Sequence, residues 1–570
     1  MAKVEEVFDL VIVGSGGGGL VAALAAADSG LRPVVLEKQE LVGGSTAMSG
    51  GVIWMPNNPL MREEGVPDSR DSALAYFQAV VGDPDEGSSL ARRSTFLDRG
   101  SEMIQFLRDK GVELVRCEGY ADYYDLLDGG SRRGRAVEPK PWDGKRLGEW
   151  YTRINPGFAR GIGLAVKTNE TRKILSFHRS PRTFATTTRV FLRTVISRAL
   201  GKDLFANGMS LIAQLTRLTL DAGVPIWTGA GVDELLVEDG AVVGVVLTHN
   251  GVRKEIRARR GVLLAAGGFE RNPDMRRKYT EKTQPNDGEW TAGSQGNTGE
   301  VLAAAIALGA KTDYMDEAIW QPSPRSELAV STLAVARQWP NTIFVNQQGK
   351  RFCNESNSYI EVGRAMYAHD ATPAWLIFDD RYRRNAEWGF GLPRLKDWKS
   401  AIPGNLPEEW VSKGWIRRAD TIEDLARQIG IDPQQLCATI EKFNAAALEG
   451  RDPEFGRGES QYNKELGDPG NKVNPAVGPL NTGPYYATEI YPGDVGTAGG
   501  VVTNEHAQVI DGSNAPIPGL YATGNMTATV MGRYYLGAGS SIANTMVFGY
   551  VAALHAKDPK NAVVSSELAS

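Results

Sequence analysis

Cysteine and histidine are both scarce in this sequence of 570 residues. The three cysteines lie far apart, at Cys117, Cys353 and Cys437, and form no Cys-x-x-Cys pair. This spacing predicts no disulfide framework, no zinc site and no iron–sulfur cluster, so we expect no bound metal. Free cysteines are typical of a protein in a reducing compartment.

Long apolar runs are also missing. No stretch of about 18 apolar residues occurs, so we expect no helix that spans a membrane. The chain begins with acidic Glu5 and Glu6 and continues directly into a strand-like run, which predicts no signal peptide. We therefore expect a cytoplasmic protein. A net charge of −5 argues against a dedicated nucleic-acid binder.

Glycine, by contrast, is abundant, with 65 residues, and one cluster of glycines follows an apolar strand. The sequence predicts a strand over Phe8–Val13, a helix over Leu20–Asp28 and a second strand over Pro33–Glu37. The turn between the first strand and the helix has the GxGxxG pattern at Gly14, Gly16 and Gly19. In this context the pattern predicts a dinucleotide site, with the pyrophosphate at the helix N-terminus and Glu37 accepting hydrogen bonds from a ribose.

Further glycine-rich segments follow in a set order. Leu41–Gly51 is a second Gly/Ser/Thr loop, Gly261–Gly268 is a strand that ends in glycines, and Gly519–Asn525 precedes a last helix that opens with Ser541–Asn544. Together they resemble the FAD-binding family of the fumarate reductase flavoprotein type. The resemblance implies noncovalent FAD, since the Gly43–Gly51 loop has no His or Cys. It also implies that the last helix directs its N-terminus at the flavin.

On this resemblance, backbone N–H groups of Ser541 and Ile542 contact the flavin ring, and Asn525 faces the ribityl or pyrophosphate region. The full set of residues expected to bind FAD is Gly14, Ser15, Gly16, Gly19, Glu37, Lys38, Gly44, Ser45, Thr46, Ser49, Gly50, Gly51, Val232, Ala266, Gly267, Gly524, Asn525, Ser541 and Ile542.

The length of the chain predicts two domains of an α/β protein. We expect a Rossmann-like FAD-binding domain formed by residues 1–316 and 489–570, with an inserted α+β catalytic domain at 317–488. Within the insert, capping signals predict helices over Ile422–Ile429 and from Pro433 to Ala447. Residues 451–484 are rich in Gly, Pro and Asn and are expected to form an ordered loop.

A basic segment interrupts the first domain at about residues 150–205. Arg153–Lys202 contains eleven Lys and Arg residues and one acidic residue, Glu170. Phe184, Phe191 and neighbouring apolar residues fall close to helical spacing. Such a helix is typical of peripheral contact with an anionic membrane. A solvated insertion packed on the FAD domain is the alternative, and no recognised nucleic-acid-binding fold accompanies the charge.

The five histidines are His178, His249, His369, His506 and His555, and none lies in a glycine-rich loop beside the expected flavin. Fumarate-reductase-like enzymes hold a dicarboxylate with cationic His and Arg. The corresponding loop, Gly496–Gly500, has neither, which argues against an acid substrate.

Tyrosines occur in three distinctive motifs instead: GYADYY at 119–124, RFCNESNSY at 351–359 and RYYLGAG at 533–539. Together with GGST…SGG and GGFERN, these motifs resemble the bacterial 3-ketosteroid Δ1-dehydrogenases over nearly the full length. The resemblance implies a 3-ketosteroid substrate and an external electron acceptor such as a quinone or dye.

The resemblance also implies residue roles. The Tyr535 hydroxyl and the Gly539 N–H bind the C3 ketone oxygen, Tyr359 removes a proton from C2, Tyr123 supports Tyr359, and FAD N5 accepts hydride from C1. Tyr120 and Tyr124 are the alternatives to Tyr123. The physical logic is general, because polarising a ketone acidifies the adjacent C–H bond.

One motif departs from the family. YLGAG replaces the usual YPGPG, so Leu536 and Ala538 stand where prolines are common. We expect a looser loop around Gly539 and a change in the preferred steroid or in the bond desaturated. A 3-ketosteroid Δ4-(5α)-dehydrogenase or another cyclic-ketone desaturase is therefore the nearest alternative, and a fumarate-reductase-like enoate reductase is a more distant one.

Overall fold

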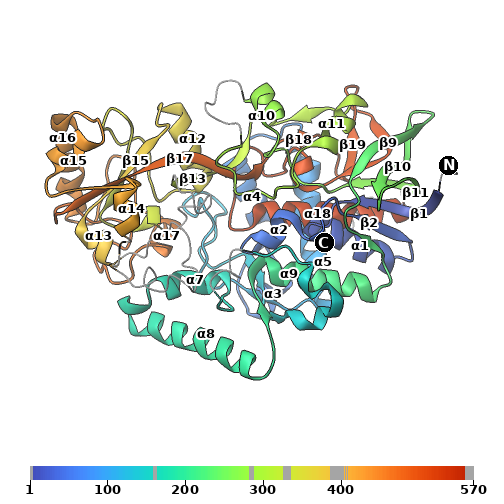
Figure 1. Ribbon diagram of the computed structural model, residues 1–570, viewed down its shortest axis with the longest axis horizontal. Helices are drawn as coiled ribbons and strands as arrows, with labels where there is room; N and C mark the ends of the chain where they lie inside the picture. The colour runs from blue at the N-terminus through green and yellow to red at the C-terminus, as the bar shows by residue number, and fades with distance from the viewer. Residues whose placement is uncertain are drawn as a thin grey trace.

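A mostly parallel sheet with the N-terminal strand near its centre organises the larger part of the chain (Figure 1). The computed structural model describes residues 4–157, 163–280, 288–324, 336–385 and 404–558, without 405 and 407. The strand order is β19-β20-β11-β1-β2-β8, and β10 and β9 extend it as antiparallel strands from β11. The strands of this first sheet are β1 (Val4–Val13), β2 (Pro33–Leu36), β8 (Ile226–Trp227), β9 (Val232–Glu238), β10 (Ala241–His249), β11 (Val252–Leu264), β19 (Gln508–Ile510) and β20 (Pro516–Ala522).

Alternate residues of β1 contribute to cores on opposite faces of this sheet. Leu10 and Ile12 belong to the core that contains the helices, whereas Val11 and Val13 belong to the core on the other face. Parallel strands buried on both faces need such nearly continuous apolar sequence, which is what FDLVIV provides. The helices packed in the first core include α1 (Gly17–Asp28), α4 (Arg70–Val81), α5 (Leu90–Asp109), α9 (Asn207–Asp221) and α18 (Ser540–Lys557), and α10 (Pro273–Tyr279) and α11 (Glu300–Ala307) lie on the other side.

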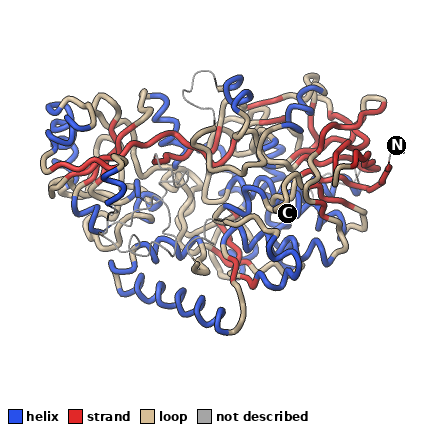
Figure 2. The backbone as a smooth tube through the Cα atoms, in the orientation of Figure 1, coloured by secondary structure: helices blue, strands red, loops and turns tan. Residues whose placement is uncertain are grey.

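A second, antiparallel sheet lies at the other end of the molecule (Figure 2). Its order is β13-β17-β15-β14, and β16 also pairs with β17. Its strands are β13 (Ala318–Pro324), β14 (Thr342–Val345), β15 (Ala374–Phe378), β16 (Ile416–Ala419) and β17 (Tyr485–Thr497). Its neighbouring helices are α12 (Tyr359–Ala368), α13 (Asp380–Asn385), α14 (Glu408–Ser412), α15 (Ile422–Gln428), α16 (Pro433–Ala447) and α17 (Gln461–Glu465).

Shorter elements complete the described structure. Three small sheets are formed by β3 (Ile53–Trp54) with β4 (Leu114–Arg116) and β5 (Ala136–Pro139), by β6 (Trp142–Asp143) with β7 (Leu204–Phe205), and by β12 (Thr312–Asp313) with β18 (Gly500–Val501). The remaining helical segments are α2 (Gly44–Met48), α3 (Pro59–Glu63), η1 (Gly144–Thr152), α7 (Thr168–Leu175), η2 (Phe177–Arg179), α8 (Pro181–Ala199), η3 (Ala336–Gln338) and η5 (Gly524–Met526).

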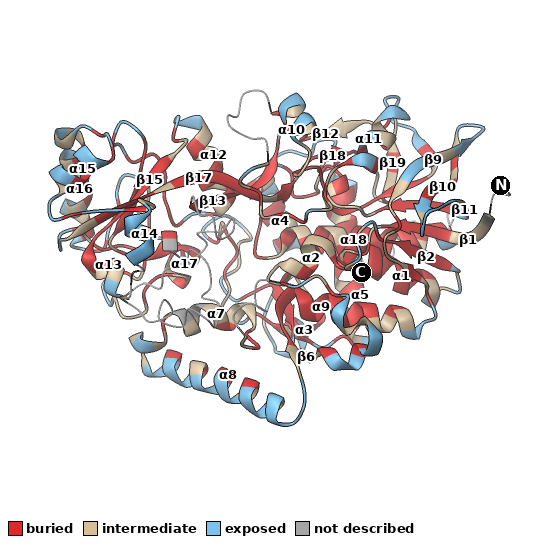
Figure 3. Cartoon of the chain, in the orientation of Figure 1, coloured by how far each residue is buried: buried red, intermediate tan, exposed pale blue. Residues whose placement is uncertain are grey.

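Helix α8 stands away from the body of the protein and is exposed along most of its length (Figure 3). Its buried residues are polar or small: Thr183, Thr186, Val190 and Thr194. Its exposed face carries the large apolar side chains Phe184, Phe191, Leu192, Val195 and Ile196. A solvated surface helix buries its apolar side chains and exposes its polar ones, so the arrangement in α8 is the reverse. Residues 158–162 of the predicted basic segment lie outside the described residues.

The mixed α/β class and the main elements agree with the sequence predictions. Helix α16 has Asp432 as its N-cap and Pro433 at its first position, and α15 begins after Thr421, whose side chain accepts from Asp424 N. The 451–484 loop also contains the short helix α17. The division into domains at 317–488 stays a prediction. In the part of the chain that the structure describes, no helix has both the length and the hydropathy needed to cross a bilayer.

Candidate active site

The glycines of the first turn occupy positions that a side chain would obstruct. Gly14 has φ +107°, and a Cβ there would lie 2.4 Å from the Ala265 carbonyl oxygen. A Cβ on Gly19 would lie 2.1 Å from the Gly14 oxygen, so the helix could not pack against its own strand. Gly16 precedes α1, and no side chain caps the helix there. This end of α1 therefore has the backbone geometry and dipole that suit a pyrophosphate.

Glu37 lies immediately after β2 and faces the glycine turn. Its carboxylate accepts hydrogen bonds from Ser15 N at 3.1 Å and Gln39 N at 2.9 Å, and these bonds lower the pKa of Glu37, whereas burial raises it and prevails. The Lys38 ammonium pairs with Glu300 at 2.6 Å. A contact of Lys38 with the cofactor stays a prediction.

The second Gly/Ser/Thr loop forms α2 and packs against the first. Thr46 Oγ1 accepts from Gly17 N at 3.2 Å. This bond joins the second Gly/Ser/Thr loop to the glycine turn before α1. Ser45 Oγ accepts from Ser294 N at 3.0 Å, and Ser49 Oγ accepts from Gly51 N at 3.0 Å. These hydroxyl groups hold the loop by accepting hydrogen bonds, which leaves the O–H groups of Ser45 and Thr46 as donors beside the backbone N–H groups. Gly50 lies beside Thr168, whose hydroxyl donates to the Gly50 carbonyl at 2.7 Å.

The strand ends of β11 and β20 lie beside each other, as parallel neighbours must. Ala266 and Gly267 follow β11, and Gly524 and Asn525 follow β20. The Asn525 amide lies close to Gly496, where a Cβ would be 2.5 Å from Nδ2. Val232, the remaining predicted contact, begins β9 and packs against the core on the second face.

Helix α18 begins at a tight loop that requires glycine. Gly539, its N-cap, has φ +89°, and a Cβ there would lie 2.0 Å from the Val52 carbonyl oxygen. The loop is not held by prolines but by its neighbours: Leu536 is fully buried, and its carbonyl accepts from Tyr123 N at 3.0 Å and Tyr76 Oη at 2.7 Å. These contacts hold the carbonyl of Leu536 in the loop, and the effect of the missing prolines stays a prediction.

The three predicted catalytic tyrosines come together in space from segments more than 170 residues apart. Ring centroids are 5.4 Å apart for Tyr359 and Tyr535, 5.5 Å for Tyr123 and Tyr359, and 5.8 Å for Tyr123 and Tyr535. A fourth ring, Tyr462, packs 4.4 Å from Tyr123. We call Tyr123, Tyr359, Tyr462 and Tyr535 the tyrosine cluster.

Burial is the largest effect on the Tyr359 hydroxyl and holds its pKa well above the ordinary value for tyrosine. The neighbouring hydroxyl groups act in opposite directions, since Tyr123 lowers this pKa by hydrogen bonding and Tyr535 raises it. The Tyr535 hydroxyl is 3.0 Å from Ser541 Oγ at the start of α18. The supporting role of Tyr123 stays a prediction.

Other aromatic residues near the cluster make contacts of their own. Tyr124 donates its hydroxyl to Glu361 at 3.0 Å, whereas the Tyr123 ring contacts that of Tyr359. Trp54 is a core residue that stacks on Phe96. Trp320 packs in the same apolar cluster as Tyr123 and Tyr535. Sequence reasoning missed Tyr462, because a lone tyrosine in a polar stretch carries no motif.

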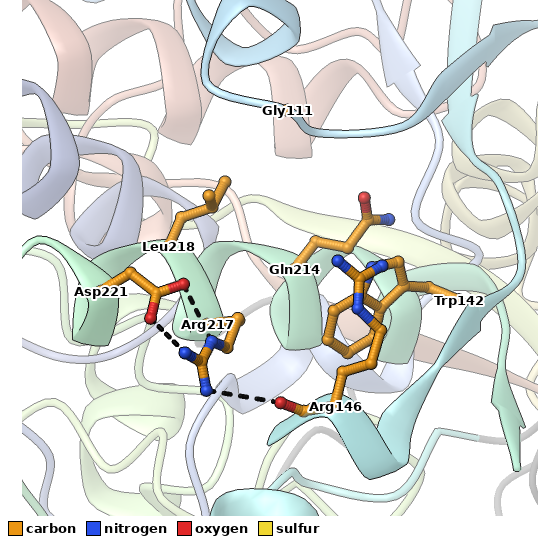
Figure 4. Close-up of a pocket in the computed structure, with 7 residues that line it drawn as sticks. All are labelled: Gly111, Trp142, Arg146, Gln214, Arg217, Leu218 and Asp221. Carbon is orange, nitrogen blue, oxygen red and sulfur yellow. Dashed lines mark hydrogen bonds and ion pairs between the residues drawn. The ribbon is translucent and has the colours of Figure 1, made fainter. Parts of the chain in front are cut away.

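A pocket of about 420 Å³ lies elsewhere, at α9 and η1 (Figure 4). Arg217 forms an ion pair with Asp221 along the helix, and Arg146 lies over the Trp142 ring. None of the predicted site residues lines this pocket. The residues that line it are Gly111, Trp142, Arg146, Gln214, Arg217, Leu218 and Asp221.

Comparisons with known proteins show the family of the chain. The model of the FAD binding domain family matches residues 9–542. A 3-oxosteroid 1-dehydrogenase of Mycolicibacterium smegmatis is 40% identical over 564 residues, which cover 96% of each chain. The chain belongs to the family of FAD-binding 3-oxosteroid 1-dehydrogenases.

Two further members extend the comparison. The crystal structure of a 3-ketosteroid Δ1-dehydrogenase from Sterolibacterium denitrificans, in complex with 1,4-androstadiene-3,17-dione, has a TM-score of 0.90 and 34% identity and covers 97% of this chain and 100% of that one. The 4-oxocyclohex-2-ene-1-carboxylate 5-dehydrogenase of Sinomonas cyclohexanicum is 34% identical and covers 95% of this chain and 92% of its own.

The family establishes the chain as an FAD-dependent oxidoreductase, and the residues present fit this cofactor. The glycine turn before α1 has room only for hydrogen at Gly14 and Gly19, the two positions at which a dinucleotide-binding turn needs glycine for its tight bend and for helix–strand packing. The acid at the end of β2 and the uncapped N-terminus of α18 supply the two other features that an extended flavin dinucleotide needs.

Proposed function

We propose that this protein desaturates the C1–C2 bond of 3-ketosteroids, as part of steroid breakdown. The observation that carries the proposal is the meeting of Tyr359 and Tyr535, at 5.4 Å between ring centroids, beside the N-terminus of α18. The names of the relatives support the choice of substrate, because the family members at 40% and 34% identity include enzymes of this activity.

In the proposed reaction Tyr535 and Gly539 act on the ketone. The Tyr535 hydroxyl and the Gly539 N–H hold the C3 oxygen and stabilise the negative charge that develops there, each by about 3 kcal/mol. The polarised ketone acidifies C2, and Tyr359 removes the C2 proton. Tyr123 stabilises the resulting tyrosinate by donating a hydrogen bond to it. When bound, FAD supplies the acceptor for the hydride that leaves C1.

The cofactor contacts and the domain division belong to the same proposal. The predicted FAD residues lie in the segments that follow β1, β2, β11 and β20 or at the start of α18, except Val232, which begins β9. Residues 317–488 would then form the catalytic domain, which contributes Tyr359. The electron acceptor that reoxidises the flavin would be a quinone or a similar external molecule.

The test is turnover of androst-4-ene-3,17-dione by the FAD-loaded protein with a dye acceptor, with product identified by mass spectrometry and NMR. We expect the 1,4-diene. Formation of no 1,4-diene would refute the assignment, and a product that differs at C4–C5 after incubation with a 5α-3-ketosteroid would favour a Δ4-(5α)-dehydrogenase.

A smaller cyclic ketone is the second candidate substrate. It is favoured by the relative at 34% identity that acts on 4-oxocyclohex-2-ene-1-carboxylate. Side-by-side kcat/KM values for the steroid and for 4-oxocyclohexanecarboxylate separate the two, and a higher value for the carboxylate would reverse our choice.

We also propose that α8 binds the surface of an anionic membrane. Phe184, Phe191 and Ile196 are 61%, 55% and 54% exposed on one face. Exposed Arg182, Arg189, Arg198 and Lys202 accompany them. Burying large apolar side chains in a bilayer is favourable by roughly 1.5–3 kcal/mol each, and arginines pair with anionic headgroups. A membrane-dissolved steroid would then be close to the enzyme.

This contact is tested by sedimentation with vesicles of phosphatidylcholine with or without phosphatidylglycerol. We expect binding that requires the anionic lipid and is lost in the variant Phe184→Ser/Phe191→Ser/Ile196→Ser. The variant Leu448→Ser/Val473→Ser is a matched control, since both side chains are more than 60% exposed on other segments. Equal binding of the α8 variant and the wild type would refute the proposal.

A further inference from the structure

Residues 452–465 lie between the two loops that carry Tyr123 and Tyr359. We call this segment the clamp. Its two ends bond to different loops, although those loops are separated by more than 200 residues of sequence. It ends in the short helix α17, which contains Tyr462.

The first set of clamp contacts holds the loop that precedes Tyr359. Arg351 forms buried ion pairs with Asp452 and with Glu355, at 2.8 and 2.9 Å. Arg457 donates to Ser356 Oγ at 3.0 Å and to Glu355 at 3.1 Å. Such fully desolvated ion pairs are costly to break singly, because a buried charge is left alone. The clamp and the Tyr359 loop are therefore one rigid unit.

The second set holds the loop that carries Tyr123. The Asp125 carboxylate accepts the backbone N–H of Gln461 at 3.1 Å and of Tyr462 at 3.3 Å. Glu465 accepts Ala121 N at 2.9 Å. The Tyr462 ring packs on Tyr123 at a centroid distance of 4.4 Å, the shortest ring contact in the tyrosine cluster.

The Tyr462 hydroxyl is fixed from the opposite side. Arg337, which is fully buried, donates to it at 3.1 Å and donates also to the carbonyl of Glu355 at 2.7 Å. The Tyr462 ring thus cannot rotate away from Tyr123 without breaking a buried hydrogen bond to a cation.

We propose that Tyr462 is a positioning residue for the dehydrogenation: anchored by Arg337, its ring keeps Tyr123 packed against Tyr359, from where Tyr123 donates a hydrogen bond to the base. This inference rests on the proposed function, since it assigns the clamp a purpose in the reaction of Tyr359. It goes beyond that function because the proposed reaction gives Tyr462 no step of its own. Its contribution is to the placement of Tyr123.

The test is a double-mutant cycle between Tyr123 and Tyr462, measured with androst-4-ene-3,17-dione and a dye acceptor. Tyr462→Leu removes the ring, and Tyr462→Phe removes only the bond to Arg337. We expect kcat to fall at least tenfold in Tyr462→Leu and a few-fold in Tyr462→Phe, with KM changed less than threefold. The pH range in which the rate increases as the base loses its proton should move to higher pH in both variants.

The expected signature is non-additivity, because both changes remove one hydrogen bond to Tyr359. Tyr123→Phe/Tyr462→Leu should be no slower than Tyr123→Phe alone. Losses of kcat that add in the double variant would overturn the positioning role. So would a kcat of Tyr462→Phe below that of the wild type with an unchanged pH–rate profile. If Tyr462→Leu fails to bind FAD, the cycle is measured with Tyr123→Phe, Tyr462→Phe and their double variant. Additive losses in that cycle would likewise overturn the positioning role.

Tyr382→Phe is the control for loss of a buried hydroxyl, since Tyr382 is 1% exposed in the core of the second sheet, away from the tyrosine cluster. It should keep wild-type kcat and pH profile. A wild type that does not dehydrogenate the steroid would instead refute the proposed function, and the positioning role with it.

Discussion

The hydroxyl oxygens of Tyr535 and Ser541 lie 3.0 Å apart, and Ser541 N also approaches the Tyr535 hydroxyl at 3.4 Å. The phenol is thereby fixed at the N-terminus of α18, where the helix dipole favours negative charge. A ketone oxygen bound by Tyr535 would thus lie in a field that stabilises an enolate. This single contact links the cofactor-binding helix to the tyrosine cluster.

Tyr535→Phe should reduce kcat by about 10²–10³, because it removes one of the two donors to the ketone oxygen. KM should change less, since the ring and its packing remain. Steady-state kinetics with the steroid and a dye acceptor measures both. The control is Ser541→Ala, which removes a neighbour of the phenol but leaves the donor; a loss as large in Ser541→Ala would show that Tyr535 is not itself the donor.

Tyr359→Phe should abolish turnover almost completely, with a loss of about 10²–10⁴ expected for a general base. Binding of the steroid product, followed by the change in flavin absorbance, should persist because the apolar ring remains. Tyr124→Phe is a suitable comparison, since its hydroxyl bonds to Glu361. Turnover of Tyr359→Phe within a few-fold of wild type would assign the proton transfer to another group.

The pH–rate profile should rise with pH, because Tyr359 must lose its proton to act as a base. Burial places the pKa of Tyr359 above its ordinary value, and the hydrogen bond from Tyr123 lowers it. Tyr123→Phe removes only the lowering effect, so the rising limb should move to higher pH. At a fixed pH below the limb, the rate falls about tenfold for every pH unit by which the limb moves upward. A limb that moves to lower pH would contradict this role of Tyr123.

The sequence is sufficient to predict those parts of the site that have a local signature. GxGxxG, the acid at Glu37 and the opening of α18 at Gly539 each follow from short-range backbone requirements. The three tyrosines follow from resemblance, and their meeting depends on contacts between distant segments. Tyr462 and Arg337 could not be predicted, because their roles arise from packing across the two sheets.

Two further contacts of the site also join segments that the sequence alone does not bring together. The Lys38 ammonium pairs with Glu300, 262 residues further along the chain. The Leu536 carbonyl accepts from Tyr123 N and from Tyr76 Oη, and no local pattern reveals either bond.

Glu270→Gln should stabilise the protein more at pH 8 than at pH 5. Glu270 is fully buried beside Asp494, and burial raises its pKa to about 7. A carboxyl with a raised pKa in the folded state keeps its proton there while the unfolded chain loses it, so stability falls as pH rises from about 4.5 to 7. Above pH 7 Glu270 is ionised in both the folded and the unfolded state. The decrease in unfolding free energy then has its full value, up to about 3 kcal/mol.

Glutamine cannot ionise, and it keeps an oxygen that can accept from Asn297 Nδ2, which lies 2.6 Å from Glu270 Oε1. The difference in unfolding free energy between variant and wild type should therefore increase between pH 5 and pH 8, as measured by urea denaturation of the FAD-loaded protein. Other titrating groups affect both proteins alike and cancel in the difference. A difference that is constant with pH would mean that Glu270 remains charged in the folded state, with Arg271 and the neighbouring amides stabilising the carboxylate.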